Sequence, residues 1–292
     1  MTIPTYPERR PLALSDKGLL DKLFARLQPQ LSECTFAGLY LFRQPHDYHL
    51  TLVGNALVVL GRGYDGNPYF LPPLSGDIKD ATRILLAHDE TLYGADEPFV
   101  KRYLADIAVQ VSEDRDNFDY LYQRQELAEL PGNRYHKKKN RINYFTARHS
   151  HAVELFGPAH REGSLLLLDD WLKSRRDEEQ RTLVSETAAT AEALELHEPL
   201  DLQGVVVLVN GEVKGFALGE RLNTETAVCH FEKADPFMEG LPQLVNREFS
   251  RLLFNDCRFI NREQDLGEPG LRAAKLSYHP VGFVRKYRIR AT

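Results

Sequence analysis

Two β-hairpin signals constrain the fold of this chain more than any other feature. Gly54-Asn55 and Asn210-Gly211 each separate two strand-like segments, and Gly and Asn are the residues that tolerate the positive φ of a tight hairpin turn. After each hairpin come a further strand and then a helical pattern. The recurrence predicts two α/β domains of similar plan, related by structural duplication rather than by a sequence repeat.

The other elements are predicted from hydrophobic periodicity and from the positions of Gly and Pro. In the first half we expect strands at 36–42, 48–53, 56–60 and 68–72, and helices at 19–27, 78–87 and 99–104. In the second half we expect helices at 134–148, 165–176, 178–196 and 238–254, two strands within 202–222, further strands at 226–232, 257–262 and 281–289, and a short helix from Pro269. A helical run at 118–130 ends at Pro131-Gly132, so we expect domains at 1–131 and 132–292.

Composition excludes several classes of protein. The 292 residues are 42% hydrophobic and carry a net charge of -5, which describes a globular chain whose surface as a whole does not suit nucleic acid. There is no CxxC pair, metal-ligand spacing, GxSxG, Walker or GxGxxG motif, so no metal is expected. Nothing resembles a signal peptide or a membrane span. We expect a soluble, cytoplasmic protein without stable membrane insertion.

The stretch 261–280 gathers polar side chains where a predicted strand meets a predicted helix. If the strand stays extended through the turn, Asn261, Glu263 and Asp265 project to one side. An amide and two carboxylates in that position can orient and deprotonate an amine. Alternatively, the same groups cap the helix near Pro269 and hold a loop in place.

A histidine and two further carboxylates each allow two interpretations. His230 and Glu232 alternate on a predicted strand, so they share a face and form either an acid/base pair or an ordinary hydrogen bond. Glu248 lies within the apolar stripe of the helix at 238–254 and needs a partner there. Burial would tune Glu248 as an acid or base, whereas a neighbouring Arg or Lys would keep it charged.

Basic residues concentrate in the predicted helix at 134–148. Its cations at helical spacing form one stripe, with a further lysine beside it: Arg134, Lys137, Arg141 and Arg148, and Lys138. Phosphate is the natural partner of such a stripe. A solvated helix face is the alternative interpretation.

Three motifs resemble one known family. YHKKKNRIN at 135–143, HFEKAD at 230–235 and NREQDLGEPGLRAAKLSYHP at 261–280 resemble uncharacterised proteins grouped with the C-terminal domain of lysylphosphatidylglycerol synthase. The resemblance covers nearly the whole chain. It implies an α/β (α+β) fold of two tandem GNAT-like domains, the acyltransferase fold, each a mixed sheet flanked by helices, and similarity to the Fem-type aminoacyltransferases.

The same resemblance implies transfer of an acyl or aminoacyl group, with aminoacyl-tRNA as the donor. By position, His230 and Lys233 stand where the lipid-modifying relatives have an aspartate and an arginine, whereas Asn261 matches an asparagine. The altered pair leaves the acceptor open. We expect an amine or hydroxyl on a small molecule or a phospholipid headgroup.

A charge argument separates the possible donors. GNAT enzymes that use acetyl-CoA hold its pyrophosphate on a Gly-rich loop at a helix N-terminus. The corresponding segment at 233–240 has one glycine and two acidic residues, and the segment at 74–77 is no better. Both would repel a pyrophosphate. Aminoacyl-tRNA is therefore favoured over acyl-CoA as co-substrate, with the basic stripe against the acceptor stem, and no other cofactor is indicated.

The resulting hypothesis is direct attack of the acceptor on an activated ester. The candidate catalytic residues are Asp265, Glu263 or His230 as base and Lys233 or Lys275 as stabiliser of the oxyanion. The candidate substrate-binding residues are Glu232, Asn246, Glu248, Asn261, Lys275 and Tyr278. We expect Glu232, Lys233 and Glu248 to line one cleft. Two alternatives stay open: an acyl-CoA-dependent N-acyltransferase, and a non-catalytic module that binds an amino acid, a peptide or an RNA end.

Overall fold

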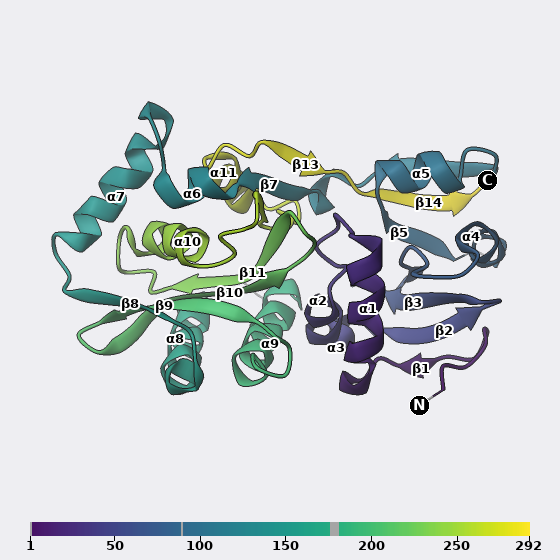
Figure 1. Cartoon of the computed structure of the whole chain (residues 1–292), viewed down its shortest axis with the longest axis horizontal. Coiled ribbons are helices and arrows are strands. Elements are labelled where there is room, and N and C mark those ends of the chain that lie inside the picture. Colours follow the sequence, from purple (N-terminus) through teal and green to yellow (C-terminus); the bar gives the residue numbers. More distant parts are fainter. Residues whose placement is uncertain (1, 89, 176–180) are drawn as a thin grey trace. The chain divides into compact units, whose positions relative to one another are not determined.

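The chain forms two mixed β-sheets flanked by helices (Figure 1). The computed structural model describes residues 2–88, 90–175 and 181–292. The fold divides into two compact units: unit 1 comprises Met1–Asp119, Gln264–Pro269 and Phe283–Thr292, and unit 2 comprises Tyr120–Glu263 and Gly270–Gly282. The domain limits predicted from the sequence are 1–131 and 132–292. They differ from the limits of these compact units and stay a prediction.

The first sheet, in unit 1, has the strand order β1-β2-β3-β4-β5-β14-β6. Its strands are β1 (Arg10–Pro11), β2 (His49–Val53), β3 (Ala56–Arg62), β4 (Pro68–Phe70), β5 (Thr91–Ala95), β6 (Val109–Glu113) and β14 (Tyr287–Ala291). The helices are α1 (Lys17–Leu27), α2 (Phe36–Leu41), α3 (Arg43–His46), α4 (Ile78–Leu86) and α5 (Glu97–Tyr103), with 3-10 turns η1 (Leu14–Asp16) and η2 (Arg115–Asn117). The predicted hairpin joins β2 to β3, and its Gly54 has a φ of 60°.

The second sheet has the order β13-β7-β12-β11-β10-β9-β8. Its strands are β7 (Asp119–Gln123), β8 (His151–Leu155), β9 (Gln203–Val209), β10 (Glu212–Arg221), β11 (Thr226–Ala234), β12 (Phe259–Asn261) and β13 (Gly282–Val284). The helices are α6 (Arg124–Glu129), α7 (His136–Thr146), α8 (Arg161–Lys173), α9 (Arg181–Glu195), α10 (Leu241–Leu252) and α11 (Pro269–Leu276), with η3 (Asn133–Tyr135) and η4 (Pro158–His160). The second hairpin turns at Asn210 and Gly211, with φ of 53° and 85°.

The predicted duplication is confirmed. In unit 1 the hairpin is followed by β4, α4 and β5, and β4 pairs with β5 in parallel. In unit 2 the hairpin is followed by β11, α10 and β12, and β11 pairs with β12 in parallel. Helix α10 covers one face of the second sheet and α8 and α9 cover the other (Figure 1). Of the predicted apolar stripe of α10, Leu241, Leu244, Val245 and Phe249 are buried, whereas Leu252 is only partly buried.

Three predicted elements are wrong, each for a physical reason. Residues 36–42 begin with helix α2 because the Thr35 hydroxyl caps its first turn, accepting a hydrogen bond from the Gly38 N–H at 3.0 Å. The run at 118–130 begins as strand β7 because pairing with β12 overrides its helical pattern. The closing strand at 281–289 is two strands, β13 and β14, in different sheets. Strands β5, β6 and β8 were not predicted.

Candidate active site

Strands β11 and β12 separate at the point where the polar side chains of unit 2 gather. They pair only through residues 226–228 and 259–261, although β11 continues to Ala234. At the same point the register between β10 and β11 skips His230, which is a β-bulge. The bulge interrupts the alternation that the sequence predicts, and His230 and Glu232 bond to different partners.

Glu232 forms the centre of a compact polar cluster on the α10 side of β11. Its Oε2 accepts hydrogen bonds from Asn246 Nδ2 and from Arg262 Nη2, both at 3.0 Å. The Arg262 guanidinium lies 5.8 Å from the ring of Tyr122 and 5.1 Å from the ring of Tyr278, so aromatic faces flank the cation. This cluster joins β11, α10, β12 and β7 without any contribution from unit 1.

Two buried polar atoms in this cluster have no hydrogen-bond partner among the residues that the structure describes. They are Asn246 Oδ1, an acceptor, and Arg262 Nη1, a donor. Asn246 is only 2% exposed, and an unmade hydrogen bond at such a site costs about 1–3 kcal/mol. Folded proteins satisfy nearly all buried polar groups with protein or water, so the unpaired donor and acceptor beside one carboxylate are free to bond an ordered water or a polar ligand.

Lysines extend the cluster on the side of Tyr278. Lys138, from α7, lies 3.9 Å above the Tyr278 ring and donates to Ser277 Oγ at 2.7 Å. Burial, reinforced by the charges of Arg262 and Arg141, lowers the pKa of Lys138 to about 8. Lys275 donates to the Arg262 carbonyl, and its role as stabiliser of the oxyanion stays a prediction.

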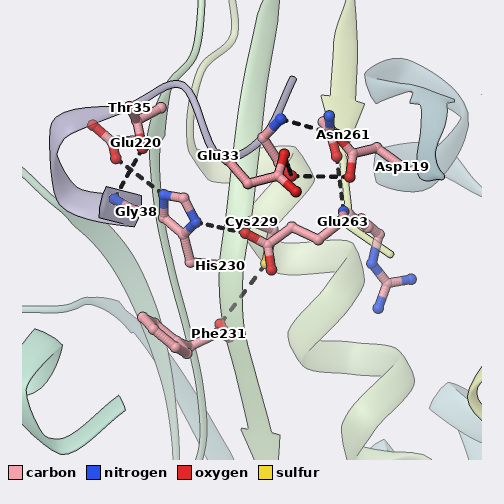
Figure 2. Close-up of polar contacts among 12 residues, drawn as sticks. Glu33, Thr35, Gly38, Asp119, Glu220, Cys229, His230, Phe231, Asn261 and Glu263 are labelled. Atoms are coloured by element: carbon pink, nitrogen blue, oxygen red, sulfur yellow. Dashed lines mark hydrogen bonds and ion pairs between the residues drawn. The ribbon is translucent and has the colours of Figure 1, made fainter. Parts of the chain in front are cut away.

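His230 lies between two carboxylates (Figure 2). Its Nδ1 is 2.7 Å from Glu263 Oε1 and its Nε2 is 3.0 Å from Glu220 Oε1. Burial alone lowers the pKa of the imidazole, but hydrogen bonds and charges from both carboxylates outweigh burial and raise the pKa to about 10. Both ring nitrogens therefore lie within hydrogen-bond distance of a carboxylate oxygen, and the role of His230 as a base stays a prediction.

The turn after β12 does not present its polar groups as predicted. Glu263 has a φ of +55°, so the backbone is not extended and Asn261, Glu263 and Asp265 do not follow the predicted alternation. Instead, Asn261 Oδ1 accepts the Glu263 N–H at 2.8 Å (Figure 2). Asp265 belongs to unit 1, where its buried carboxylate bonds Arg115 at 3.2 Å and the Gly267 N–H at 2.9 Å. A catalytic role for Asp265 stays a prediction.

The three side chains expected to line one cleft have separate partners. Lys233 points to the face of α8 and α9, where Nζ is 2.6 Å from Glu186 Oε1 and 3.9 Å from the Trp171 ring. Glu232 points to α10 because successive residues of a strand face opposite sides. Glu248 has the arginine neighbours that one of its two interpretations requires: its two oxygens accept from Arg247 and Arg251 of the same helix at 2.8 and 2.7 Å. Its role in substrate binding stays a prediction.

The predicted basic stripe lies on α7 and the residues that flank it. Arg134 pairs with Glu126, Arg141 Nε is 3.9 Å from Glu239 Oε1, and Arg148 stacks on the Tyr144 ring at 3.5 Å. Lys137 is exposed and has no ion pair within the described ranges. The stripe is therefore partly neutralised, and its role in phosphate binding stays a prediction.

Sequence reasoning missed the most informative member of the cluster, Arg262. An extended backbone through 261–265 would place Asn261 on the face of the predicted site and Arg262 on the opposite face of the strand, so the pattern favours Asn261 as a site residue. Tyr122 was missed because it lay in the run predicted as a helix. The one available signal was position, since Arg262 lies inside the motif at 261–280.

Within the described residues, no helix is long and apolar enough to cross a bilayer. The same residues contain no group of three or more His, Cys, Asp or Glu side chains that could hold a metal ion.

The fold defines a pair of tandem GNAT-like domains. The chain is similar to a tandem GNAT protein from the clavulanic acid biosynthesis pathway, with a TM-score of 0.51 and 12% identity over 96% of this chain and 97% of that one. More particularly, the chain belongs to the family described as "Phosphatidylglycerol lysyltransferase, C-terminal", whose sequence model matches residues 24–290.

Two solved structures extend this assignment. A conserved protein of unknown function from Bacteroides thetaiotaomicron is similar over 100% of both chains, with a TM-score of 0.89 and 28% identity. The C-terminal domain of a putative lysylphosphatidylglycerol synthetase from Agrobacterium fabrum is similar over 95% of this chain and 92% of that one, with a TM-score of 0.66 and 14% identity. The family and the fold together relate the chain to transferases.

Proposed function

We propose that this protein transfers an aminoacyl group from aminoacyl-tRNA to an amine or hydroxyl acceptor, and that the cluster of Glu232, Asn246 and Arg262 binds the aminoacyl group. One observation carries the proposal: a buried acceptor and a buried donor, both unpaired, surround a carboxylate. An α-aminoacyl ester has the complementary groups, a cationic ammonium beside a carbonyl oxygen. Membership in a family described by a lysyltransferase name supports the proposal.

In this arrangement the ammonium group bonds Glu232 and Asn246 Oδ1, and the ester carbonyl accepts from Arg262 Nη1. Attack by the acceptor nitrogen or oxygen forms the new bond to the carbonyl carbon. The bond to the ribose oxygen then breaks, and the proton of the acceptor passes to that leaving oxygen. The hydrogen bond from Arg262 strengthens most in the transition state, because negative charge develops on the carbonyl oxygen that accepts it.

The two helix N-termini support a tRNA donor over CoA. In unit 1 the Asp77 carboxylate already accepts from the Asp80 N–H at the start of α4, which is where a phosphate would bind. In unit 2 the loop before α10 carries Asp235 and Glu239, whose charges oppose a pyrophosphate. The cations of α7 supply the phosphate contacts for an acceptor stem, and a phospholipid headgroup hydroxyl is the acceptor that the family description suggests.

The proposal is tested by incubating the protein with tRNA charged with single labelled amino acids and with candidate acceptors, among them phosphatidylglycerol vesicles and free amines. Transfer is followed by mass spectrometry. We expect Arg262→Gln to reduce product formation at least 100-fold. Arg258→Gln is the matched control, since Arg258 lies just before β12 but is exposed, and it should retain activity. Turnover of acyl-CoA instead, or binding without product, would contradict the proposal.

A further inference from the structure

The β-bulge in β11 places His230 where three separate segments meet. One carboxylate partner, Glu220, comes from β10, and the other, Glu263, comes from the turn after β12. The His230 side chain is 1% exposed, whereas Glu220 and Glu263 are 15% and 24% exposed. These two carboxylates are the charged groups hydrogen-bonded to the imidazole, and they bond it at opposite ends of the ring (Figure 2).

The geometry fixes the protonation state of the ring. An ionised carboxylate only accepts hydrogen bonds, so each ring nitrogen must donate. A neutral imidazole has one donor and one acceptor, and it would leave one nitrogen lone pair facing a carboxylate oxygen at 2.7 or 3.0 Å. The doubly protonated ring satisfies both contacts, and a buried cation between two anions is compensated.

The same contacts hold the backbone beside Arg262 in an unusual conformation. Glu263 adopts a φ of +55°, which is unfavourable for a residue with a Cβ. Three bonds restrain it: His230 holds its side chain, Asn261 Oδ1 accepts its N–H, and its carbonyl accepts from Tyr120 N at 3.1 Å. Arg262 immediately precedes this residue, so the direction of its side chain depends on the turn.

We propose that His230 is a permanently charged bridge that positions Arg262, and that it takes no part in proton transfer. This inference rests on the proposed function only in so far as Arg262 contacts the substrate. His230 is thus a positioning residue: its two bonds tie β10 and β11 to the turn after β12 where the two parallel strands separate. The expectation that His230 acts as the base is replaced by this role.

The charge state can be measured without any substrate. In protein labelled with [15N]histidine, both ring nitrogens of His230 should have imidazolium chemical shifts throughout pH 6 to 9, with the resonance assigned by its loss in His230→Gln. One deprotonated ring nitrogen at pH 7.5 would overturn the proposal. Glu263→Gln removes one anion, and the titration of His230 should then move toward that of an ordinary histidine; an unchanged titration would also count against the proposal.

The positioning role has its own readout. With [15N]arginine, the Nε–Hε signal of Arg262, assigned by Arg262→Gln, should shift or broaden in His230→Gln while the fold is retained by circular dichroism. His160→Gln is the matched control, because His160 bonds one carboxylate, Glu154, at 3.1 Å. An Arg262 signal equally unaffected in both variants would contradict positioning. Since neither spectrum needs a substrate, failure of the bridge and failure of the transfer reaction are distinguishable.

Discussion

The two units follow one plan, yet they treat a buried cation in different ways. In unit 1, Lys286 is fully buried and its ammonium group bonds Glu33 at 2.7 Å, Asp119 at 2.6 Å and Ser32 at 3.5 Å. In unit 2, Arg262 bonds Glu232, but within the described part of the chain Arg262 Nη1 and Asn246 Oδ1 have no hydrogen-bond partner. The charged groups of the first cluster bond one another. In the second cluster, one donor and one acceptor are left without partners among the described residues.

This difference shows that a buried charge does not by itself mark a functional site. The corresponding region of unit 1, between β4, α4 and β5, is packed with apolar side chains such as Phe70, Leu85 and Leu92. The region in unit 2 has Glu232, Arg262 and Asn246 in its place. Of these two corresponding regions, the one in unit 2 contains a buried donor and a buried acceptor that have no hydrogen-bond partner among the described residues.

The largest effect on stability is expected in unit 1. Lys286→Met leaves Glu33 and Asp119 buried without their cation, which should reduce the free energy of unfolding by about 3–5 kcal/mol. Urea denaturation of wild type and variant measures this loss in the free energy of unfolding. A change below about 1 kcal/mol would show that water compensates these carboxylates and would remove the contrast between the units.

Arg262→Gln should show the opposite profile. Glu232 keeps its bond to Asn246 and is 19% exposed, so we expect the free energy of unfolding to fall by only about 1–3 kcal/mol, while transfer falls at least 100-fold. Urea denaturation and the product assay on the same preparation decide the point. A loss of stability as large as that of Lys286→Met would make Arg262 a structural residue.

His230→Gln sharpens the comparison through pH. The folded-state pKa of His230 is raised from 6.5 to about 10, so its contribution to stability is complete below pH 6.5 and is lost as the pH rises through 10. We expect wild type to exceed the variant by about 2 kcal/mol at pH 6.5 and the gap to close toward pH 10. A gap that is constant over this range would contradict a charged bridge.

The smallest effect concerns Lys138. Its pKa is lowered to about 8, so the protonated form destabilises the folded state below pH 8 and the penalty disappears as the pH approaches 10.5. Lys138→Met should therefore raise the free energy of unfolding at pH 7, by at most about 1 kcal/mol once solvent screening is allowed for. Thermal unfolding of wild type and variant at pH 7 and pH 10.5 measures the gain in stability. An equal gain at both pH values would show that the buried charge of Lys138 is not its cause.

Local sequence signals predicted the parts of the fold that local chemistry determines. The Gly and Asn turns predicted both hairpins, and the apolar spacing of α10 predicted its buried face. The strand β7 and the helix α2 were mispredicted because strand pairing and a threonine cap decided them. In the site, the candidate substrate-binding residues Glu232, Asn246 and Tyr278 lie in one cluster. Arg262 was not predicted there, since a bulge at His230 and a left-handed residue at Glu263 change the direction of the side chains.

The central claim is that the Glu232 cluster binds an α-aminoacyl ester. The most direct measurement is an NMR titration of the protein with the methyl esters of α-amino acids and with the corresponding esters that lack the amino group. The account predicts that only the amino forms perturb the Arg262 Nε signal, and that Asn246→Leu abolishes the response. Equal responses to both kinds of ester, or an unchanged response in Asn246→Leu, would contradict it.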